Sequence, residues 1–341
     1  MLTSASARGA SGLALALILA GCSSSTAQTP APLGATGSLG ASSAGTGSFG
    51  QKTAQSVDRG FMKAVAPQET LLYMSTFGTA AIVDVLTTSG ELVGQITNGL
   101  VEPEGLFVDS GGNLWVANFS NVLEYPHGAL SPTTALSDAV GYPVDVSICP
   151  NGTTYVANFY NNSDSNVASI QVYPPGETSP TGNLTFQNDF RNPFVTCDAA
   201  GNVFAAILTG DSLGDGRVIE FPLGQQDGAK DLGITLQSPG GIKPDNAGNL
   251  LVTDLVANTI SEYTESGSPT GKSIATGFPI LGIALSRDGK TVLGANPNGP
   301  DGITWSFPGG KQKRVYTCCS RIGPPIQNNF GVAFYPGQKD I

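Results

Sequence analysis

The sequence predicts an all-β protein in which six four-stranded antiparallel sheets close into a ring, and three observations support this prediction. The first is the composition: 45 of the 341 residues are Gly, 23 are Pro, and only 12% are charged. Such a composition suits many short strands joined by turns better than long amphipathic helices. The second is an internal repeat whose units each contain four apolar runs. The third is that the two ends of the repetitive region complement each other.

Each repeat begins with a proline that is followed by an apolar run, a turn and a second apolar run. The turn contains a Gly-Asn or Asp-Gly pair, residues that tolerate positive φ and favour a tight hairpin. A third run, such as VLEYPHG or VIEFPLG, follows, and a weaker fourth run completes the unit. Four strands in roughly 40–50 residues is the period of a β-propeller blade. The leading prolines are separated by 40, 50, 46 and 40 residues: Pro103, Pro143, Pro193, Pro239 and Pro279.

A sixth blade is expected from the two ends of the repetitive region. Residues 70–98 contain three apolar runs without a leading one, and residues 329–336 resemble a leading strand with nothing after it. Joining them makes one composite blade and removes the sheet edges that an open ring would expose. The sequence therefore predicts a six-bladed β-propeller over residues 70–341, closed by the C-terminal strand joining the first blade.

The N-terminal segment has the features of an export signal. Arg8 gives a short positive region, and residues 12–20 form an apolar stretch that is too short to span a bilayer. Leu19-Ala20-Gly21-Cys22 resembles the bacterial lipoprotein box, in which the chain is cut before a cysteine that is then acylated. This resemblance implies a signal peptide over residues 1–21, lipidation at Cys22 and a membrane partner bound through the lipid. Ser23 after the cysteine favours an outer-membrane lipoprotein facing the periplasm or the cell surface. The alternative is an ordinary secretory signal in which Cys22 is incidental.

Residues 22–69 are expected to form a disordered tether that begins at the lipidated cysteine. They are rich in Ser, Gly and Ala and have almost no large apolar residues, so they cannot bury a core. A coil of this length would have an end-to-end distance of about 35–40 Å.

The repeat also resembles a known family. The pattern P-x-G-x-x-x-D-x-x-G-N-L-W-V-A-N followed by I-x-x-Y is similar to NHL-repeat proteins and to the wider six-bladed group with SMP-30/gluconolactonase and streptogramin lyase. In the calcium-dependent lactonases of that group, one Glu, two Asn and one Asp at the channel mouth hold the metal. The resemblance therefore implies a candidate channel-mouth ligand or metal site at Glu104, Asp145 and Asn329. The corresponding positions of other blades are Gly or apolar, so calcium would lack oxygen ligands there. The sequence thus predicts no cofactor, with bound calcium as the alternative.

A second set of polar residues belongs to the face on which propellers usually bind ligands. Asn118, Asn158, Asp254 and Asn296 end the second strands, where a polar side chain is expected to cap local backbone donors. Asp211 and Asp215 stand in an acidic loop that is either solvated or a calcium ligand. The lyase resemblance would need catalytic histidines, but His127 is the only His and is expected in a surface turn.

Four cysteines follow Cys22, and an exported chain would meet an oxidising compartment. The simplest pairing is Cys149 with Cys197, in first strands of neighbouring blades, together with a vicinal Cys318–Cys319 bond. The rival is pairing of the blade cysteines with the 318–319 loop.

The function that these features favour is a non-catalytic, lipid-anchored binding module with a protein or glycan ligand on its loop face. The formal net charge of −10 argues against a nucleic-acid partner, because binding phosphates needs a basic surface. We expect a monomer. The alternatives are a divalent-cation-dependent hydrolase of the gluconolactonase type, which would use Glu104 and Asp145, and a structural envelope lipoprotein.

Overall fold

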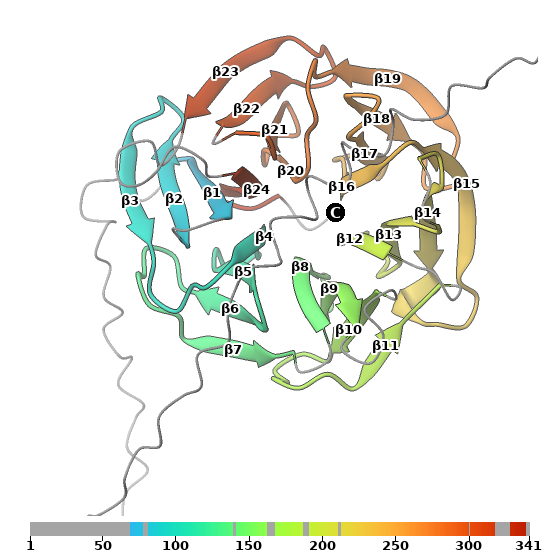
Figure 1. Ribbon diagram of the computed structural model, residues 1–341, viewed down its shortest axis with the longest axis horizontal. Coiled ribbons are helices and arrows are strands. Elements are labelled where there is room, and N and C mark those ends of the chain that lie inside the picture. The colour runs from blue at the N-terminus through green and yellow to red at the C-terminus, as the bar shows by residue number, and fades with distance from the viewer. Residues whose placement is uncertain are drawn as a thin grey trace, which may run out of the picture. The chain divides into compact units, whose positions relative to one another are not determined.

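The computed structural model describes residues 69–77, 81–138, 141–161, 168–186, 191–210, 213–299, 301–317 and 328–338. The strands in this part of the chain form six four-stranded antiparallel sheets around a common axis (Figure 1). The predicted six-bladed propeller is therefore confirmed. Cys22, Asp211, Cys318 and Cys319 lie outside the described residues.

We number the blades in chain order and call the first strand of each its inner strand. Blade 1 combines the two ends of the described region, and each later blade is one continuous segment. Blade 1 contains β24 (Asn328–Tyr335), β1 (Leu71–Phe77), β2 (Ile82–Thr87) and β3 (Leu92–Ile96). Blade 2 contains β4 (Pro103–Val108), β5 (Leu114–Asn118), β6 (Asn121–Tyr125) and β7 (Thr134–Ser137). Blade 3 contains β8 (Gly141–Ile148), β9 (Thr154–Asn161), β10 (Ser169–Tyr173) and β11 (Gly182–Leu184). Blade 4 contains β12 (Arg191–Cys197), β13 (Val203–Leu208), β14 (Gly216–Phe221) and β15 (Lys230–Leu236). Blade 5 contains β16 (Pro239–Pro244), β17 (Leu250–Asp254), β18 (Thr259–Tyr263) and β19 (Pro269–Ala275). Blade 6 contains β20 (Ile283–Leu285), β21 (Thr291–Ala295), β22 (Asp301–Ser306) and β23 (Gln312–Thr317).

The ring closes through β24 and β1, as the complementary ends predicted. These strands pair antiparallel from Leu71 opposite Tyr335 to Phe77 opposite Asn328. Side chains of β1 alternate between the two neighbouring blades, as a period of two requires. Leu71 and Tyr73 join the core shared with blade 2, and Leu72 and Met74 join the core shared with blade 6.

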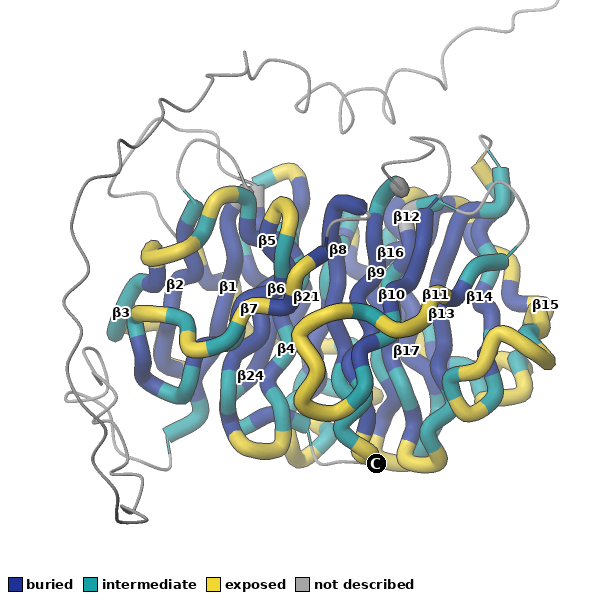
Figure 2. The backbone as a smooth tube through the Cα atoms, turned by 90° about the horizontal axis from the view of Figure 1, so that it is seen from below, coloured by how far each residue is buried: buried dark blue, intermediate teal, exposed yellow. Residues whose placement is uncertain are grey.

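The hydrophobic core is divided among the blade interfaces. Each of the six described clusters contains residues from two adjacent blades only. Buried residues fill the inner strands, and exposed residues lie mainly in turns and along outer strands (Figure 2). Because no single core spans the ring, stability comes from repeated contacts between neighbouring sheets.

The repeated Asp and Asn residues form a clamp in the turns between first and second strands. The carboxylate of Asp198 accepts hydrogen bonds from the backbone N–H of Asn202 at 2.8 Å and from its side-chain amide at 2.7 Å. Asp109 and Asp245 hold Asn113 and Asn249 in the same way. These turns also contain a glycine with positive φ, at 86° for Gly201, which explains the Gly-Asn pairs in the sequence.

The helical element in the described part is one 3-10 turn, η3 (Pro222–Gly224). Within that part, none of the helical structure has the length and apolar character needed to span a bilayer.

Candidate functional site

Two kinds of turn share one end of the blades. Since strands alternate in direction, the connections between blades lie beside the turns between second and third strands, and we call this end the loop face. The contact is direct in blade 2, where the backbone N–H of Phe119 donates to the carbonyl of Glu102 at 3.4 Å. The turns between first and second and between third and fourth strands lie on the opposite face.

The register of the inner strands separates the three residues expected to form a channel-mouth ring. Asn329 is opposite Thr76 in blade 1, as Pro103 is opposite Asn118 in blade 2. Asn329 therefore corresponds to Pro103, two positions before Gly105. A Cβ placed on Gly105 would lie 2.7 Å from the Cα of Asp145, so these two residues are neighbours at one level. Asn329, Glu104 and Asp145 thus occupy three successive levels of the channel wall.

Glycine occupies the level of Asp145 in four of the six inner strands. A Cβ added there would lie 2.1–2.9 Å from the nearest backbone atom of the next inner strand, so the small residue permits close packing of the backbones. In the described part of the chain, no group of three or more His, Cys, Asp or Glu side chains is arranged to hold a metal ion. The four positions are Gly105, Gly241, Gly282 and Gly331.

Asp145 links the inner strands of blades 3 and 4. Its carboxylate accepts a hydrogen bond from the backbone N–H of Val195 in blade 4 at 3.0 Å. Burial raises the pKa of Asp145, and the Lys243 ammonium together with backbone hydrogen bonds opposes that rise. The Lys243 Nζ atom is itself buried, 5.7 Å from the centre of the Phe107 ring. It borders a cavity of about 60 Å³ near the opposite face, where the side-chain amide of Gln338 donates to the carbonyl of Pro244 at 2.6 Å.

Glu104 is joined to the loop face through Tyr142. The Tyr142 hydroxyl donates to Glu102 Oε2 at 2.9 Å and also makes a hydrogen bond with the Glu104 side chain. Burial raises the pKa of Glu104 to about 8, helped by the nearby Glu102 charge and opposed by the bond to Tyr142. A hydroxyl has one proton to donate, so a neutral Glu104 can donate its own proton to the Tyr142 oxygen. A chain of hydrogen bonds then connects the buried acid to Glu102.

Three aromatic rings in mutual contact lie next to these carboxyl groups. Phe119 has 45% of its surface exposed and lies edge-on to Tyr142, with ring centres 5.8 Å apart. Tyr142 in turn stacks on Tyr160 at 5.7 Å. We call Glu102, Glu104, Phe119, Tyr142 and Tyr160 the aromatic–carboxyl cluster. Sequence reasoning missed its aromatic members, although the Asn-Phe pair that ends the second apolar run of two successive repeats was a visible signal.

The polar residues at the second-strand ends make local contacts. Asn118 Oδ1 accepts from the backbone N–H groups of Val101 and Glu102 at 2.7 and 3.3 Å. Asp254 accepts from four backbone N–H groups around its turn. Asn296 accepts from the N–H of Asn298 at 3.0 Å, and the Asn158 amide donates to Asp138 at 2.9 Å.

The two remaining polar residues of the predicted set, Asp215 and Asn329, also make hydrogen bonds to nearby backbone or side-chain groups. The carbonyl of Asp215 accepts both the N–H and the hydroxyl of Thr209, at 3.0 and 2.8 Å. Asn329 is buried, and its amide donates to the carbonyl of Asp301 at 3.2 Å. Asn329 belongs to strand β24, and its backbone N–H donates to the carbonyl of Asn296 at 3.3 Å, so the structure brings these two predicted residues together. Asp215 lies apart from them, just before β14 of blade 4.

His127 lies in the turn after β6, as predicted, and is half-buried there. Its ring stacks on Tyr335 with centres 3.4 Å apart, and its Nδ1 lies 3.3 Å from the Tyr73 hydroxyl. Tyr335 belongs to the closing strand β24, so this contact joins distant parts of the chain and could not be predicted from the local sequence. His127 lies on the opposite face, away from the aromatic–carboxyl cluster.

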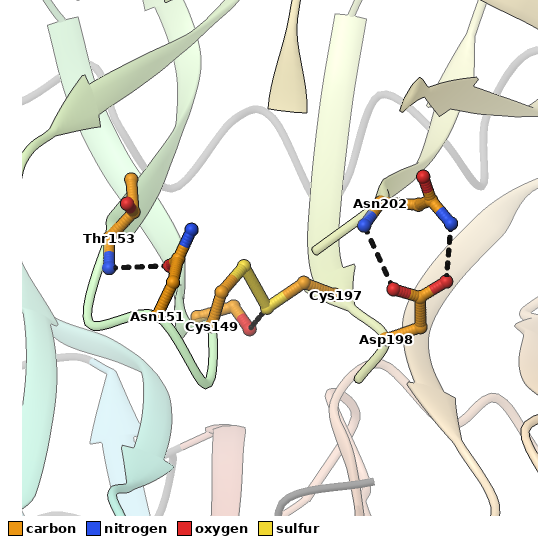
Figure 3. The surroundings of a disulfide bond; sticks show 7 residues. Cys149, Asn151, Thr153, Cys197, Asp198 and Asn202 are labelled. Atoms are coloured by element: carbon orange, nitrogen blue, oxygen red, sulfur yellow. Dashed lines mark hydrogen bonds between the residues drawn. A yellow bond between two sulfur atoms is a disulfide. The ribbon is translucent and has the colours of Figure 1, made fainter. Parts of the chain in front are cut away.

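A disulfide joins blades 3 and 4. Cys149 and Cys197 are bonded, with Cα atoms 5.6 Å apart and a sequence separation of 48 residues (Figure 3). This confirms the simplest predicted pairing for these two residues. Figure 3 also shows the Asp198–Asn202 clamp next to the bond and the Thr153 N–H donating to Asn151, so the disulfide links two tightly held turns.

Comparison with known proteins supports the fold. No family model matches the chain, and no curated protein matches it. A chain from the crystal structure of a nidogen–laminin complex matches with a TM-score of 0.63 and 13% identity, covering 79% of this chain and 99% of that one. A protein of unknown function from Bacteroides caccae matches with a TM-score of 0.59 and 11% identity, covering 78% and 98%. The WD40 β-propeller domain of Doa1 matches with a TM-score of 0.52 and 14% identity, covering 76% and 81%. Identities this low establish a shared propeller fold alone.

Proposed function

We propose that this protein is a non-catalytic binding module that holds a protein ligand on the loop face of blades 2 and 3. The observation that carries the proposal is the exposed ring of Phe119. It is fixed edge-on to the buried Tyr142, and its backbone has a φ of 44°. Rigid aromatic side chains at a surface are typical anchors of protein interfaces, because they bury a large area at low entropic cost. The partly buried Glu102 beside them would supply a directional polar contact.

We further propose that the module is displayed on the cell envelope. Cys22 would carry the lipid, residues 22–69 would form the tether, and the outer membrane would be the site of anchoring. The resemblance of the repeat to NHL proteins is part of the same proposal. The match to a chain from a nidogen–laminin complex is consistent with a propeller that binds protein, although that similarity is one of fold.

Site-specific photo-crosslinking tests the binding proposal. A photoreactive phenylalanine analogue would replace Phe119, and a control would carry it at Leu223, which is 64% exposed on the opposite face. We expect a discrete adduct from position 119 in intact cells and none from position 223. Protease digestion of the adduct would identify a protein ligand, and glycosidase sensitivity would identify a glycan. Identical adducts from both positions, or none from position 119, would contradict the proposal.

A hydrolase is the second candidate, and the raised pKa of Glu104 favours it. Carboxylic acids with strongly shifted pKa values are often catalytic acids. If this candidate is correct, the protein hydrolyses a lactone or an ester. Glu104→Gln should abolish that activity, and Glu102→Gln should retain it. For a cation-dependent enzyme, calcium would also have to raise the melting temperature. If the wild-type protein hydrolyses no substrate in a lactone panel with calcium present, this candidate is excluded for that substrate class.

A further inference from the structure

Blade 6 carries a concentration of unpaired positive charge. Five basic side chains belong to this blade, although the whole chain has only 16 basic residues against 26 acidic ones. On blades 4 and 5, by contrast, Arg217, Lys230 and Lys272 each have a carboxylate within 4 Å. Among the described residues, no such ion pair forms at the basic residues of blade 6, which are Arg287, Lys290, Lys311, Lys313 and Arg314.

Three of these cations line a groove between blades 6 and 1. The groove has a volume of about 610 Å³ and lies on the opposite face, remote from the aromatic–carboxyl cluster. Its cationic lining consists of Arg287, Lys313 and Arg314, and one carboxylate, Asp288, stands among them. The Ser286 hydroxyl and the backbone N–H of Lys290 both donate to Oδ1 of that carboxylate, at 2.7 and 3.0 Å. The lining therefore keeps a formal charge of +2.

The rest of the groove is rich in hydroxyl groups and contains an aromatic ring. Thr88, Ser286, Thr291 and Thr304 border it together with Tyr316. The Arg314 guanidinium lies 5.9 Å from the centre of the Tyr316 ring and donates to the carbonyl of Thr88 at 3.2 Å. The Lys313 ammonium donates to the Thr291 hydroxyl at 2.7 Å. These contacts hold both cations at the wall of the groove.

We propose that this groove binds an acidic saccharide through its carboxylate groups. Guanidinium groups bind carboxylates through paired, charge-assisted hydrogen bonds, and a lysine adds a point charge. The hydroxyl side chains match the hydroxyl groups of a sugar. A nucleic acid fits less well, because it needs an extended basic surface and the charge here is confined to one groove of an acidic protein.

Isothermal titration with defined oligosaccharides tests this site. The probe is a hexamer of galacturonic acid, and the neutral comparison is maltohexaose, both titrated into the full chain at 20 and 200 mM salt, chosen as roughly low and physiological ionic strength. We expect the acidic hexamer to bind, to weaken at the higher salt concentration, and to bind at least about tenfold more weakly to Lys313→Gln/Arg314→Gln, a loss of about 1.4 kcal/mol. We expect no binding of maltohexaose.

The matched control removes a positive charge from another blade. Lys230→Gln deletes an exposed lysine of blade 4 that is paired with Glu220 and should leave the affinity unchanged. Phe119→Ala should also leave it unchanged, which separates this site from the proposed loop-face function. The single variant Arg314→Lys keeps the charge and should retain partial binding if the double variant is poorly folded.

Three results would overturn the proposal. One is the absence of binding to the acidic hexamer by the wild-type protein at low salt. Another is an equal loss of affinity in Lys230→Gln, which would mean general attraction of anions. The third is equal binding of a single-stranded DNA hexamer, which would show that the groove does not select saccharides.

Discussion

Two buried carboxyl groups of the channel wall are stabilised in different ways. Burial raises the pKa of Asp145, and the backbone N–H of Val195 and the Lys243 ammonium oppose that rise. Glu104 has the Glu102 carboxylate and the Tyr142 hydroxyl as its polar neighbours, and burial disfavours its ionised form. Burial thus raises the pKa at both positions, but a cation and backbone donors oppose the rise at Asp145, whereas a like charge adds to it at Glu104.

This difference predicts how stability depends on pH at Glu104. The pKa of this group is about 8 in the folded protein and near 4.5 in an unfolded chain. Between those values the folded state holds the extra proton, so the free energy of unfolding falls as pH rises. The favourable contribution is complete below pH 4.5 and is lost as pH rises through 8. The loss should be on the order of 4 kcal/mol.

Replacing Glu104 with Gln should remove this dependence. Denaturant unfolding at pH 5 and pH 9 would show similar stability for wild type and Glu104→Gln at the lower pH. At the higher pH the variant should be more stable. Glu102→Gln should weaken the dependence without removing it, because the Glu102 charge adds to the rise in the pKa of Glu104. Parallel curves for Glu104→Gln and wild type at both pH values would contradict the assignment.

At the scale of elements, the hairpins between first and second strands are rigid units. Each of the clamps at Asp109, Asp198 and Asp245 satisfies donors of its turn with a single carboxylate. A disulfide between two such turns therefore connects units that are already ordered. It also shortens the unfolded chain by a loop of 48 residues, which in the chain-entropy model stabilises the fold.

We expect Cys149→Ala/Cys197→Ala to lower the free energy of unfolding by about 2–4 kcal/mol. Thermal and urea unfolding of the double variant would measure this loss. A Cys318→Ser/Cys319→Ser variant is the matched control, and it should lose stability on addition of a reductant as the wild type does. A reductant that leaves that control unaffected would show that the Cys149–Cys197 bond contributes nothing.

At the scale of the whole molecule, closure depends on one strand. β24 supplies Val332 and Phe334 to the interface with blade 6 and Ala333 to the interface with blade 2. It also pairs with β1 along its length. Removing β24 would therefore disrupt two of the six interfaces and expose a strand edge.

Truncation after Thr317 should abolish cooperative unfolding of the ring. The burial of Val332 and Phe334 alone contributes about 1.5–3 kcal/mol for each side chain. We expect the truncated protein to aggregate or to bind a hydrophobic dye, and truncation after Gln338 to behave as the wild type. Val332→Asp, which places a charge in the same interface, should lower the melting temperature. A truncated protein that unfolds with the wild-type midpoint would contradict the closure argument.

The blades could be predicted because their signals are local. A positive-φ glycine, an Asp–Asn clamp and an alternating apolar run each act within a few residues, so their period revealed the fold. The channel wall could not be predicted in the same way. The inner strands contain bulges, between Pro103 and Leu106 in blade 2 and around Pro143 in blade 3. Pro103 and Pro143 lie at one level in spite of these bulges, because each is opposite the Asn that ends its second strand. Glu104 follows its proline by one residue and Asp145 by two, and Asn329 takes the place of the proline. Only the strand pairing therefore shows that these three residues lie at different levels.

The aromatic–carboxyl cluster could not be predicted from local sequence either. Its members come from one blade connection, from the inner strand and one turn of blade 2, and from two strands of blade 3, so only the folded ring brings them together. The stacking of His127 on Tyr335 likewise joins residues more than half the chain apart. The cationic groove had a visible signal in the KQKR run of β23, but its partners Thr88 and Arg287 come from other turns.

The place of β1 between β24 and β2 has a mechanical consequence. Its hydrogen bonds to both neighbours are nearly perpendicular to the strand direction. A pull on Leu71 that acts along that direction would load both ladders in shear, so many hydrogen bonds would share the force instead of breaking in sequence. A strand at the rim of a blade would have one ladder to resist the same pull. The first and last strands of the propeller thus form a seam that is suited to carry tension into the ring.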